Sequence, residues 1–163
     1  MEKMVIDNDT FFADVLEVLR QGKRVTIPVK GFSMLPFIRG SKDLVVLEQA
    51  GEDLKADDIV LFHIGPEDGG RYVMHRILSV DGDAVDIMGD GVPKAHEHVH
   101  RNQILAKAME ILRAGKRSVD PYSPGQIRLV HFWQWLRPVR RYLLFIYRHF
   151  PWNRSWIKEN RSI

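Results

Sequence analysis

The sequence has 163 residues, of which 45% are hydrophobic and 28% are charged, and its formal net charge is +3. These values are typical of a single globular domain. Cysteine is absent, which excludes a disulfide scaffold, a thiol nucleophile and a cysteine metal site.

The charge is divided unevenly along the chain. Residues 1–110 contain 13 Lys+Arg and 19 Asp+Glu, a net charge of −6, whereas residues 111–163 contain 11 and 2, a net charge of +9. The second part also holds all four tryptophans, Trp133, Trp135, Trp152 and Trp156. We therefore expect an acidic body and a basic, aromatic tail with different roles.

The beginning of the chain predicts neither export nor a membrane anchor. Its first residues are acidic where a secretion signal needs basic residues followed by a long apolar run. No stretch approaches the roughly 18 uninterrupted apolar residues of a spanning helix. The expected location is cytoplasmic or peripheral to a membrane.

The first predicted element is a short helix within residues 1–24. Phe11, Val15 and Leu19 recur at the spacing of one helical face, and Gly22 is a natural stop. From Val25 onward the pattern predicts short strands separated by turns rich in Gly and Asp. The expected strands cover residues 25–29, 44–47, 59–62, 72–78, 84–88 and 104–109.

These strands predict a mainly β fold, with coiled, mostly antiparallel sheets that form a barrel-like body over residues 25–113. Residues 114–125, with two prolines, are expected to form a linker. Residues 126–163 are expected to form an amphipathic helical tail.

Ser33 is the first candidate for chemistry, because it is a lone hydroxyl within the apolar octet 31–38. Gly31 and Pro36 restrict the backbone on either side of it. A serine becomes a nucleophile only beside a base, and His63 and His75 are the imidazoles within the predicted strands. The alternative is a turn serine that bonds to nearby backbone.

Four short motifs in one order resemble the signal peptidase and LexA-like superfamily of serine peptidases. In chain order they are Gly31-x-Ser33-Met34-x-Pro36, Asp57-Asp58-Ile59-Val60-Leu61-Phe62, His75-Arg76-Ile77 and Gly89-Asp90. The resemblance spans about half of the chain. Its His-Arg pair is similar to that of the endoplasmic-reticulum and archaeal signal peptidases, whereas the bacterial enzymes use lysine.

The resemblance implies that Ser33 is the nucleophile, that His75 is the general base, and that a carboxylate orients His75. Asp90 is the predicted orienting acid, and Glu97 is the competing one. No cofactor is expected. The chain departs from the family at Gly31, where many signal peptidases have a serine that helps to form the oxyanion hole. That hole is therefore expected to use backbone N–H groups, including that of Ser33. The chain also lacks the spanning helix of signal peptidases and the DNA-binding domain of LexA-type repressors.

Three further imidazoles occur at a period of two, in His96, His98 and His100. On a strand they share one side. Because no fourth ligand is in register, an exposed polar edge is favoured over a zinc site, and no metal is expected.

The tail has a predicted apolar face and a predicted basic face. The apolar face consists of Phe132, Trp135, Leu136, Val139, Tyr142, Leu143, Ile146 and Phe150. The basic face consists of Arg137, Arg140, Arg141 and Arg148. Pro138 is expected either to begin a second helix or to kink a single one. This pattern suits an anionic membrane surface or packing on the body, and nucleic acid is the less favoured partner.

The sequence thus predicts a serine endopeptidase that cleaves an extended segment of a protein or leader peptide. The alternative is a non-catalytic binding module on the same fold, attached to a membrane or nucleic acid by its basic tail.

Overall fold

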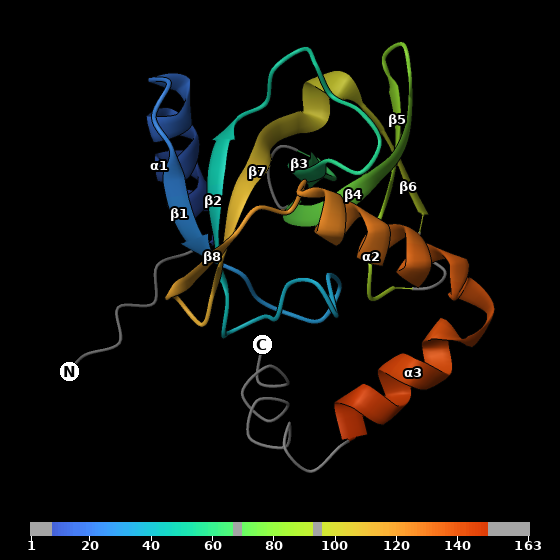
Figure 1. Ribbon diagram of the computed structural model, residues 1–163. Coiled ribbons are helices and arrows are strands. Elements are labelled where there is room, and N and C mark those ends of the chain that lie inside the picture. The colour runs from blue at the N-terminus through green and yellow to red at the C-terminus, as the bar shows by residue number, and fades with distance from the viewer. Residues whose placement is uncertain (1–7, 67–69, 93–95, 150–163) are drawn as a thin grey trace.

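The computed structural model describes residues 8–66, 70–92 and 96–149, and it consists of a mainly antiparallel β-body, one N-terminal helix and two C-terminal helices (Figure 1). The helices are α1 (Asn8–Arg20), α2 (Pro124–Trp135) and α3 (Arg137–His149), with a short 3₁₀ turn, η1 (Arg101–Gln103). The strands are β1 (Val25–Pro28), β2 (Leu44–Gln49), β3 (Ile59–Ile64), β4 (Arg71–Asp81), β5 (Ala84–Met88), β6 (His96–His100), β7 (Ile104–Arg113) and β8 (Arg117–Val119).

The strands form one sheet in the order β1-β2-β7-β3-β4-β5-β6, and β8 pairs with β7. Every pairing is antiparallel. Within the described residues the sheet is coiled but not closed, because β1 and β6 do not pair with each other. The mainly antiparallel β fold is therefore confirmed, with an open sheet in place of a closed barrel.

Two apolar clusters hold the body together. One cluster joins α1 to the sheet, because Val15 and Leu19 of the helix are buried against residues of β1, β2, β3 and β7. The helical spacing of these apolar residues explains this packing. The other cluster gathers residues of β3, β4, β5, β6 and β7 around Phe62 and Ile77. Alternation along each strand sends neighbouring side chains to opposite faces, which supplies both clusters from the same strands.

The region after the body differs from its prediction in the linker, whereas its helices follow one of the two expectations for Pro138, the start of a second helix. The expected linker, residues 114–125, contains β8, which extends the sheet beside β7. The helical tail is divided into α2 and α3, and Pro138 is the second residue of α3. The first turn of a helix tolerates proline because its N–H has no intrahelical partner there. Of the predicted tail, residues 150–163, with Phe150, Trp152 and Trp156, lie outside the described residues.

Both C-terminal helices run along one side of the body (Figure 1). None of the helices in the described part of the chain is both long enough and apolar enough to cross a bilayer.

Candidate active site

Ser33 lies in the loop that joins β1 to β2, on a run of tight turns. The turns are closed by hydrogen bonds from the N–H groups of Phe37 and Ile38 to the carbonyl of Met34, at 3.0 and 2.9 Å. Gly31 enters the loop with φ of +80°, a conformation that glycine adopts without steric cost. Met34 and Leu35 are buried, whereas Ser33 is only half-buried. The apolar octet therefore packs inward and leaves its hydroxyl-bearing residue near the surface.

Asp43 fastens the end of this loop to the sheet. Its buried carboxylate accepts hydrogen bonds from the guanidinium of Arg39 (2.8 Å), the guanidinium of Arg113 (2.8 Å) and the N–H of Ala114 (3.0 Å). Burial favours a higher pKa for Asp43, but the Arg39 and Ala114 hydrogen bonds and the Arg113 charge outweigh it, so the pKa lies below its usual value. The loop is thus held by a charged clamp that needs an ionised Asp43.

His75 lies within β4 and is 4% exposed. Its Nδ1 is 2.6 Å from Oε2 of Glu97. Glu97 belongs to β6, and β5 lies between the two strands. An ionised carboxylate can only accept, so the ring donates through Nδ1, and Nε2 is left as the acceptor. This tautomer is the one that a histidine base requires.

The turn after β5 brings the Ser33 loop close to this imidazole. A side chain at Gly89 would place its Cβ 2.6 Å from the carbonyl oxygen of Ser33 and 2.9 Å from Nε2 of His75. Only glycine fits there, because real Cβ atoms do not approach other atoms so closely. The N–H of Gly91 donates to the same Ser33 carbonyl at 2.7 Å. Among the described residues no hydrogen bond joins the Ser33 hydroxyl to His75.

Among the described residues no hydrogen bond joins Asp90 to His75, and Asp90 instead pairs with Arg76. The guanidinium donates to Oδ1 through Nε at 3.0 Å and to Oδ2 through Nη2 at 2.8 Å. Arg76 and Asp90 are 1% and 2% exposed. The carboxylate at hydrogen-bonding distance from the imidazole is therefore Glu97, the competing residue, and not the predicted Asp90. The reason is strand geometry, because His75 and Arg76 are consecutive and point to opposite faces.

Two further contacts hold Arg76 and Asp90 in place, and one of them comes from a residue that the sequence did not single out for the site, Trp133. Arg76 donates through Nη1 to the carbonyl of Asp57 at 2.8 Å. The indole N–H of Trp133 in α2 donates to the carbonyl of Asp90 at 2.8 Å. The only signal for Trp133 in the sequence was its place among the aromatic residues of the tail.

The other histidines lie apart from Ser33. His63 packs beside Tyr72, with ring centroids 5.0 Å apart. His96, His98 and His100 are exposed along β6, on the side opposite Glu97 and Val99. Within residues 8–66, 70–92 and 96–149, no group of three or more potential ligands is arranged to hold a metal ion.

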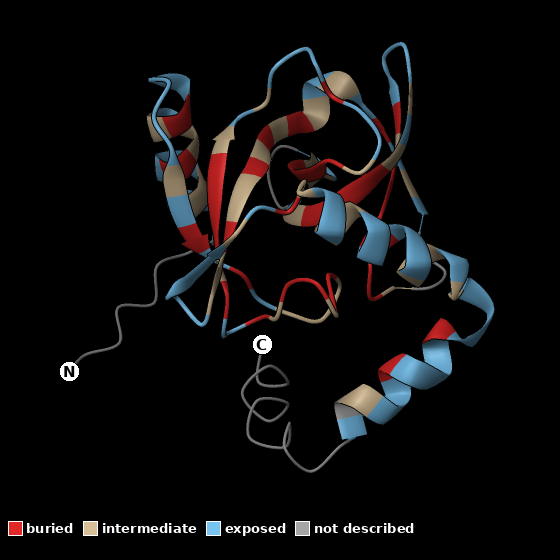
Figure 2. Ribbon diagram, in the orientation of Figure 1, coloured by how far each residue is buried: buried red, intermediate tan, exposed pale blue. Residues whose placement is uncertain are grey.

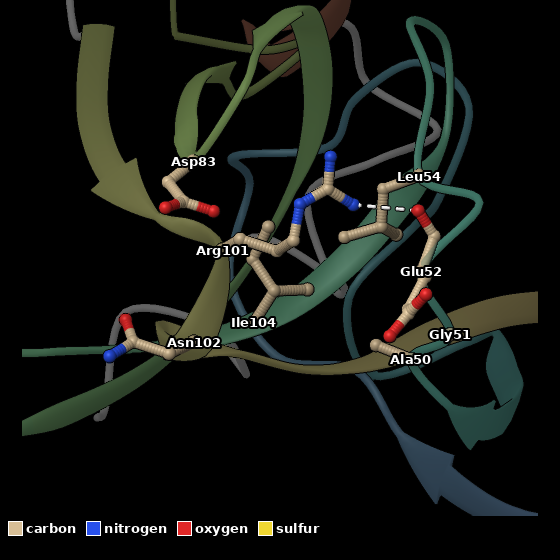
Figure 3. Close-up of a pocket in the computed structure, with 8 residues that line it drawn as sticks. All are labelled: Ala50, Gly51, Glu52, Leu54, Asp83, Arg101, Asn102 and Ile104. Carbon is tan, nitrogen blue, oxygen red and sulfur yellow. Dashed lines mark hydrogen bonds between the residues drawn. The ribbon is translucent and has the colours of Figure 1, made fainter.

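A pocket of about 340 Å³ lies elsewhere on the body (Figure 3). Its lining residues are Ala50, Gly51, Glu52, Leu54, Asp83, Arg101, Asn102 and Ile104. Arg101 donates to the carbonyls of Glu52 (2.8 Å) and Gly82 (3.2 Å). Its guanidinium thus fastens two loops to each other. None of the candidate catalytic residues lines this pocket.

Comparison of the chain with protein-family models and with curated protein sequences gives no match. The site is therefore judged from its own geometry and from the motifs that lead to it.

Proposed function

We propose that the protein is a serine endopeptidase of the signal peptidase and LexA-like type, with Ser33 as nucleophile, His75 as general base and Glu97 as the acid that orients His75. The observation that carries the proposal is the hydrogen bond of 2.6 Å between His75 Nδ1 and Glu97 Oε2. It leaves Nε2 as the basic nitrogen on the side of the ring that faces the Ser33 loop across Gly89.

The reaction proceeds by acyl transfer. His75 Nε2 takes the proton of the Ser33 hydroxyl as its oxygen attacks the carbonyl carbon of the scissile peptide bond. The imidazolium, stabilised by Glu97, then gives that proton to the leaving amine. Water activated by His75 hydrolyses the ester on Ser33 and restores the enzyme. Backbone N–H groups of the Ser33 loop stabilise the oxyanion.

The order of the four motifs supports the same proposal, with one change of role. In this chain the Gly-Asp motif supports the site through its backbone and through the Arg76–Asp90 pair, and Glu97 takes the place beside the imidazole. The substrate is an extended segment of a protein or peptide, because a serine peptidase needs access to a backbone carbonyl.

Labelling with a fluorophosphonate probe tests the proposal without knowledge of the substrate. The probe phosphonylates an activated serine, whose oxygen displaces fluoride from phosphorus, and peptide mapping by mass spectrometry identifies the modified residue. We expect label on Ser33 of the wild type, none on the Ser33→Ala variant, and labelling of the His75→Ala variant slowed by about 10⁴-fold. Ser79→Ala is the matched control, since Ser79 is an exposed serine of β4.

Circular dichroism of each variant separates loss of chemistry from loss of fold. A folded wild-type protein that takes up no label, or a His75→Ala variant that is labelled at the wild-type rate, overturns the proposal. The first of these outcomes favours the non-catalytic binding module, in which Ser33 is a turn residue.

A further inference from the structure

The two C-terminal helices present an exposed apolar surface, which we call the outer face. In the described part of the chain, every large hydrophobic residue that is exposed lies on α2 or α3. The outer face consists of Leu129, Phe132, Trp135, Val139, Tyr142, Leu143, Phe145 and Ile146. Trp135 is 74% exposed and Phe145 is 61% exposed. Large apolar side chains exposed together on neighbouring helices mark an interaction site.

The opposite side of the same helices is anchored to the body. Val130 and Leu144 are buried, and Leu144 packs with Leu35 of the Ser33 loop. The Trp133 indole bonds to the Asp90 carbonyl. The outer face is therefore the exposed side of docked helices, and its residues Leu129 and Phe132 also line a pocket of about 300 Å³ with Pro36 and Phe37 of the Ser33 loop. Figure 2 shows both helices largely exposed.

The charges around the outer face have one sign. Residues 124–149 contain no Asp or Glu. Exposed arginines lie on both helices, at Arg128 of α2 and at Arg137 and Arg141 of α3. Residues 1–110 carry a net charge of −6, so the excess of positive charge lies in the C-terminal part of the chain. Such a pattern is complementary to an anionic surface that also accepts apolar side chains.

We propose that the outer face docks on an anionic lipid bilayer, with α2 and α3 lying in the interfacial plane. Trp135 and Tyr142 suit the headgroup level of the bilayer, because each side chain combines an apolar ring with a polar N–H or O–H group. The arginines contact lipid phosphates, and the aliphatic side chains insert below them. The proposal does not depend on the peptidase chemistry.

Two other occupants fit the outer face less well. A single-stranded nucleic acid stacks on aromatic rings and leaves Leu143 and Ile146 without an apolar partner. A second copy of the chain would bring arginines against arginines, because the helices contain no acid to pair with them. A bilayer with anionic headgroups satisfies both the apolar and the cationic groups.

Vesicle flotation of the full chain tests the proposal. The probes are vesicles of phosphatidylcholine alone and of phosphatidylcholine with one quarter phosphatidylglycerol, at low and at high salt. We expect flotation with the anionic vesicles, weaker but measurable flotation at high salt, and little with the neutral ones. The Arg137→Gln/Arg141→Gln variant is expected to bind about twenty-fold more weakly at low salt. The Trp135→Ser/Phe145→Ser variant is expected to lose at least about tenfold.

The control variant is Arg20→Gln/Lys23→Gln, which removes two exposed cations near α1 and should float like the wild type. Should the Trp135→Ser/Phe145→Ser variant not fold, Val139→Ser/Leu143→Ser replaces it. Absence of flotation by the wild type overturns the proposal. Binding that high salt abolishes and that the apolar substitutions leave unchanged also overturns it, in favour of nucleic acid. If the protein does not float and light scattering shows a dimer that the apolar substitutions convert to monomers, the outer face is assigned to a second copy.

Discussion

Arg76 in the β-body and Arg140 in α3 are both almost fully buried, and their surroundings differ. Arg76 forms a two-point pair with Asp90 and a third bond to the Asp57 carbonyl. Arg140 lies over the Trp133 ring, and its Nε and Nη1 have no hydrogen-bond partner among the residues that the structure describes. Burial lowers the pKa of Arg140, the Asp90 carboxylate opposes this effect, and the Arg137 charge adds to it.

The comparison shows a difference between the body and the helices. In the body the buried arginine is paired with an acid and the large apolar side chains are covered, whereas in the helices neither is the case. In the helices a cation is buried without a matching acid, and large apolar side chains face outward. An unpaired buried charge costs free energy, and an exposed apolar face gains none from folding. We expect these features in an element whose placement serves an interaction.

The first prediction concerns the different roles of Asp90 and Glu97, and it carries the largest effect. Glu97→Gln should slow labelling of Ser33 by about 10³–10⁴-fold, because the imidazole loses its orienting charge. Its thermal unfolding should stay near that of the wild type. Asp90→Asn should instead lower the free energy of unfolding by about 3–5 kcal/mol, because the buried Arg76 loses the carboxylate with which it pairs.

Labelling rates and urea unfolding of both variants check this prediction. If Asp90→Asn slows labelling of folded protein more than Glu97→Gln does, the orienting acid is Asp90 after all.

The second prediction applies one substitution to both regions. Arg76→Met leaves the Asp90 carboxylate buried without its partner, so we expect a loss of about 3–5 kcal/mol in the free energy of unfolding. Arg140→Met removes a guanidinium that is incompletely bonded and keeps an apolar contact with Trp133. We expect it to change stability by less than about 1 kcal/mol or to raise it. Urea unfolding measures both. Equal losses of unfolding free energy in the two variants would contradict the difference that we infer between the body and the helices.

The third prediction concerns acid and has the smallest effect. Because the folded pKa of Asp43 is lowered, its contribution to stability is complete above the unfolded value of 3.8 and is lost as the pH falls through the folded pKa. The urea midpoint should therefore fall as the pH is lowered from about 5 toward 3. Arg113→Met should flatten this slope and cost on the order of 1 kcal/mol at neutral pH.

Asp81→Asn serves as the control, because Asp81 is an exposed acid at the end of β4. The urea midpoint of this variant should fall with decreasing pH as steeply as that of the wild type. The test concerns the body alone, since α2 and α3 contain no carboxylates in their side chains. A slope that Arg113→Met leaves unchanged would contradict the role of the Asp43 clamp.

Much of the fold could be predicted because local patterns determine it. The predicted strand over residues 84–88 coincides with β5, and alternation placed most of the others within a few residues. β8 could not be found, because Arg117–Val119 has no apolar alternation and becomes a strand only through its pairing with β7. Propensity alone does not identify such a strand.

The site was only partly predictable for a related reason. Ser33 and His75 stood out as a lone hydroxyl and an imidazole in apolar surroundings. The choice between Asp90 and Glu97 depends on the order β4-β5-β6 and on the register that places Glu97 opposite Ile87. One signal did exist, because alternation in β6 puts Glu97 and Val99 on the side opposite the three histidines.

The tail was predicted by its periodicity, but the periodicity does not say which side is covered. The apolar side, with Phe132 and Ile146, faces outward, and Arg140 lies inside although the pattern groups it with exposed arginines. Leu136 is half-buried between the helices, and the side chain of Arg148 lies outside the described part of the structure. A helical pattern assigns residues to faces, and the partners of each face decide its burial.

The bond from the Trp133 indole to the Asp90 carbonyl makes the helices and the Gly89–Gly91 turn one thermodynamic system. Such a coupling acts in both directions with the same free energy. A ligand that binds the outer face and favours the docked helices also stabilises this turn. A ligand bound at the Ser33 loop favours the docked helices by the same amount. Binding at the outer face therefore changes the affinity at the Ser33 loop, and binding at the loop changes the affinity at the outer face. Replacing Trp133 by phenylalanine removes the donor but keeps most of the ring, and so uncouples the two while leaving each able to bind.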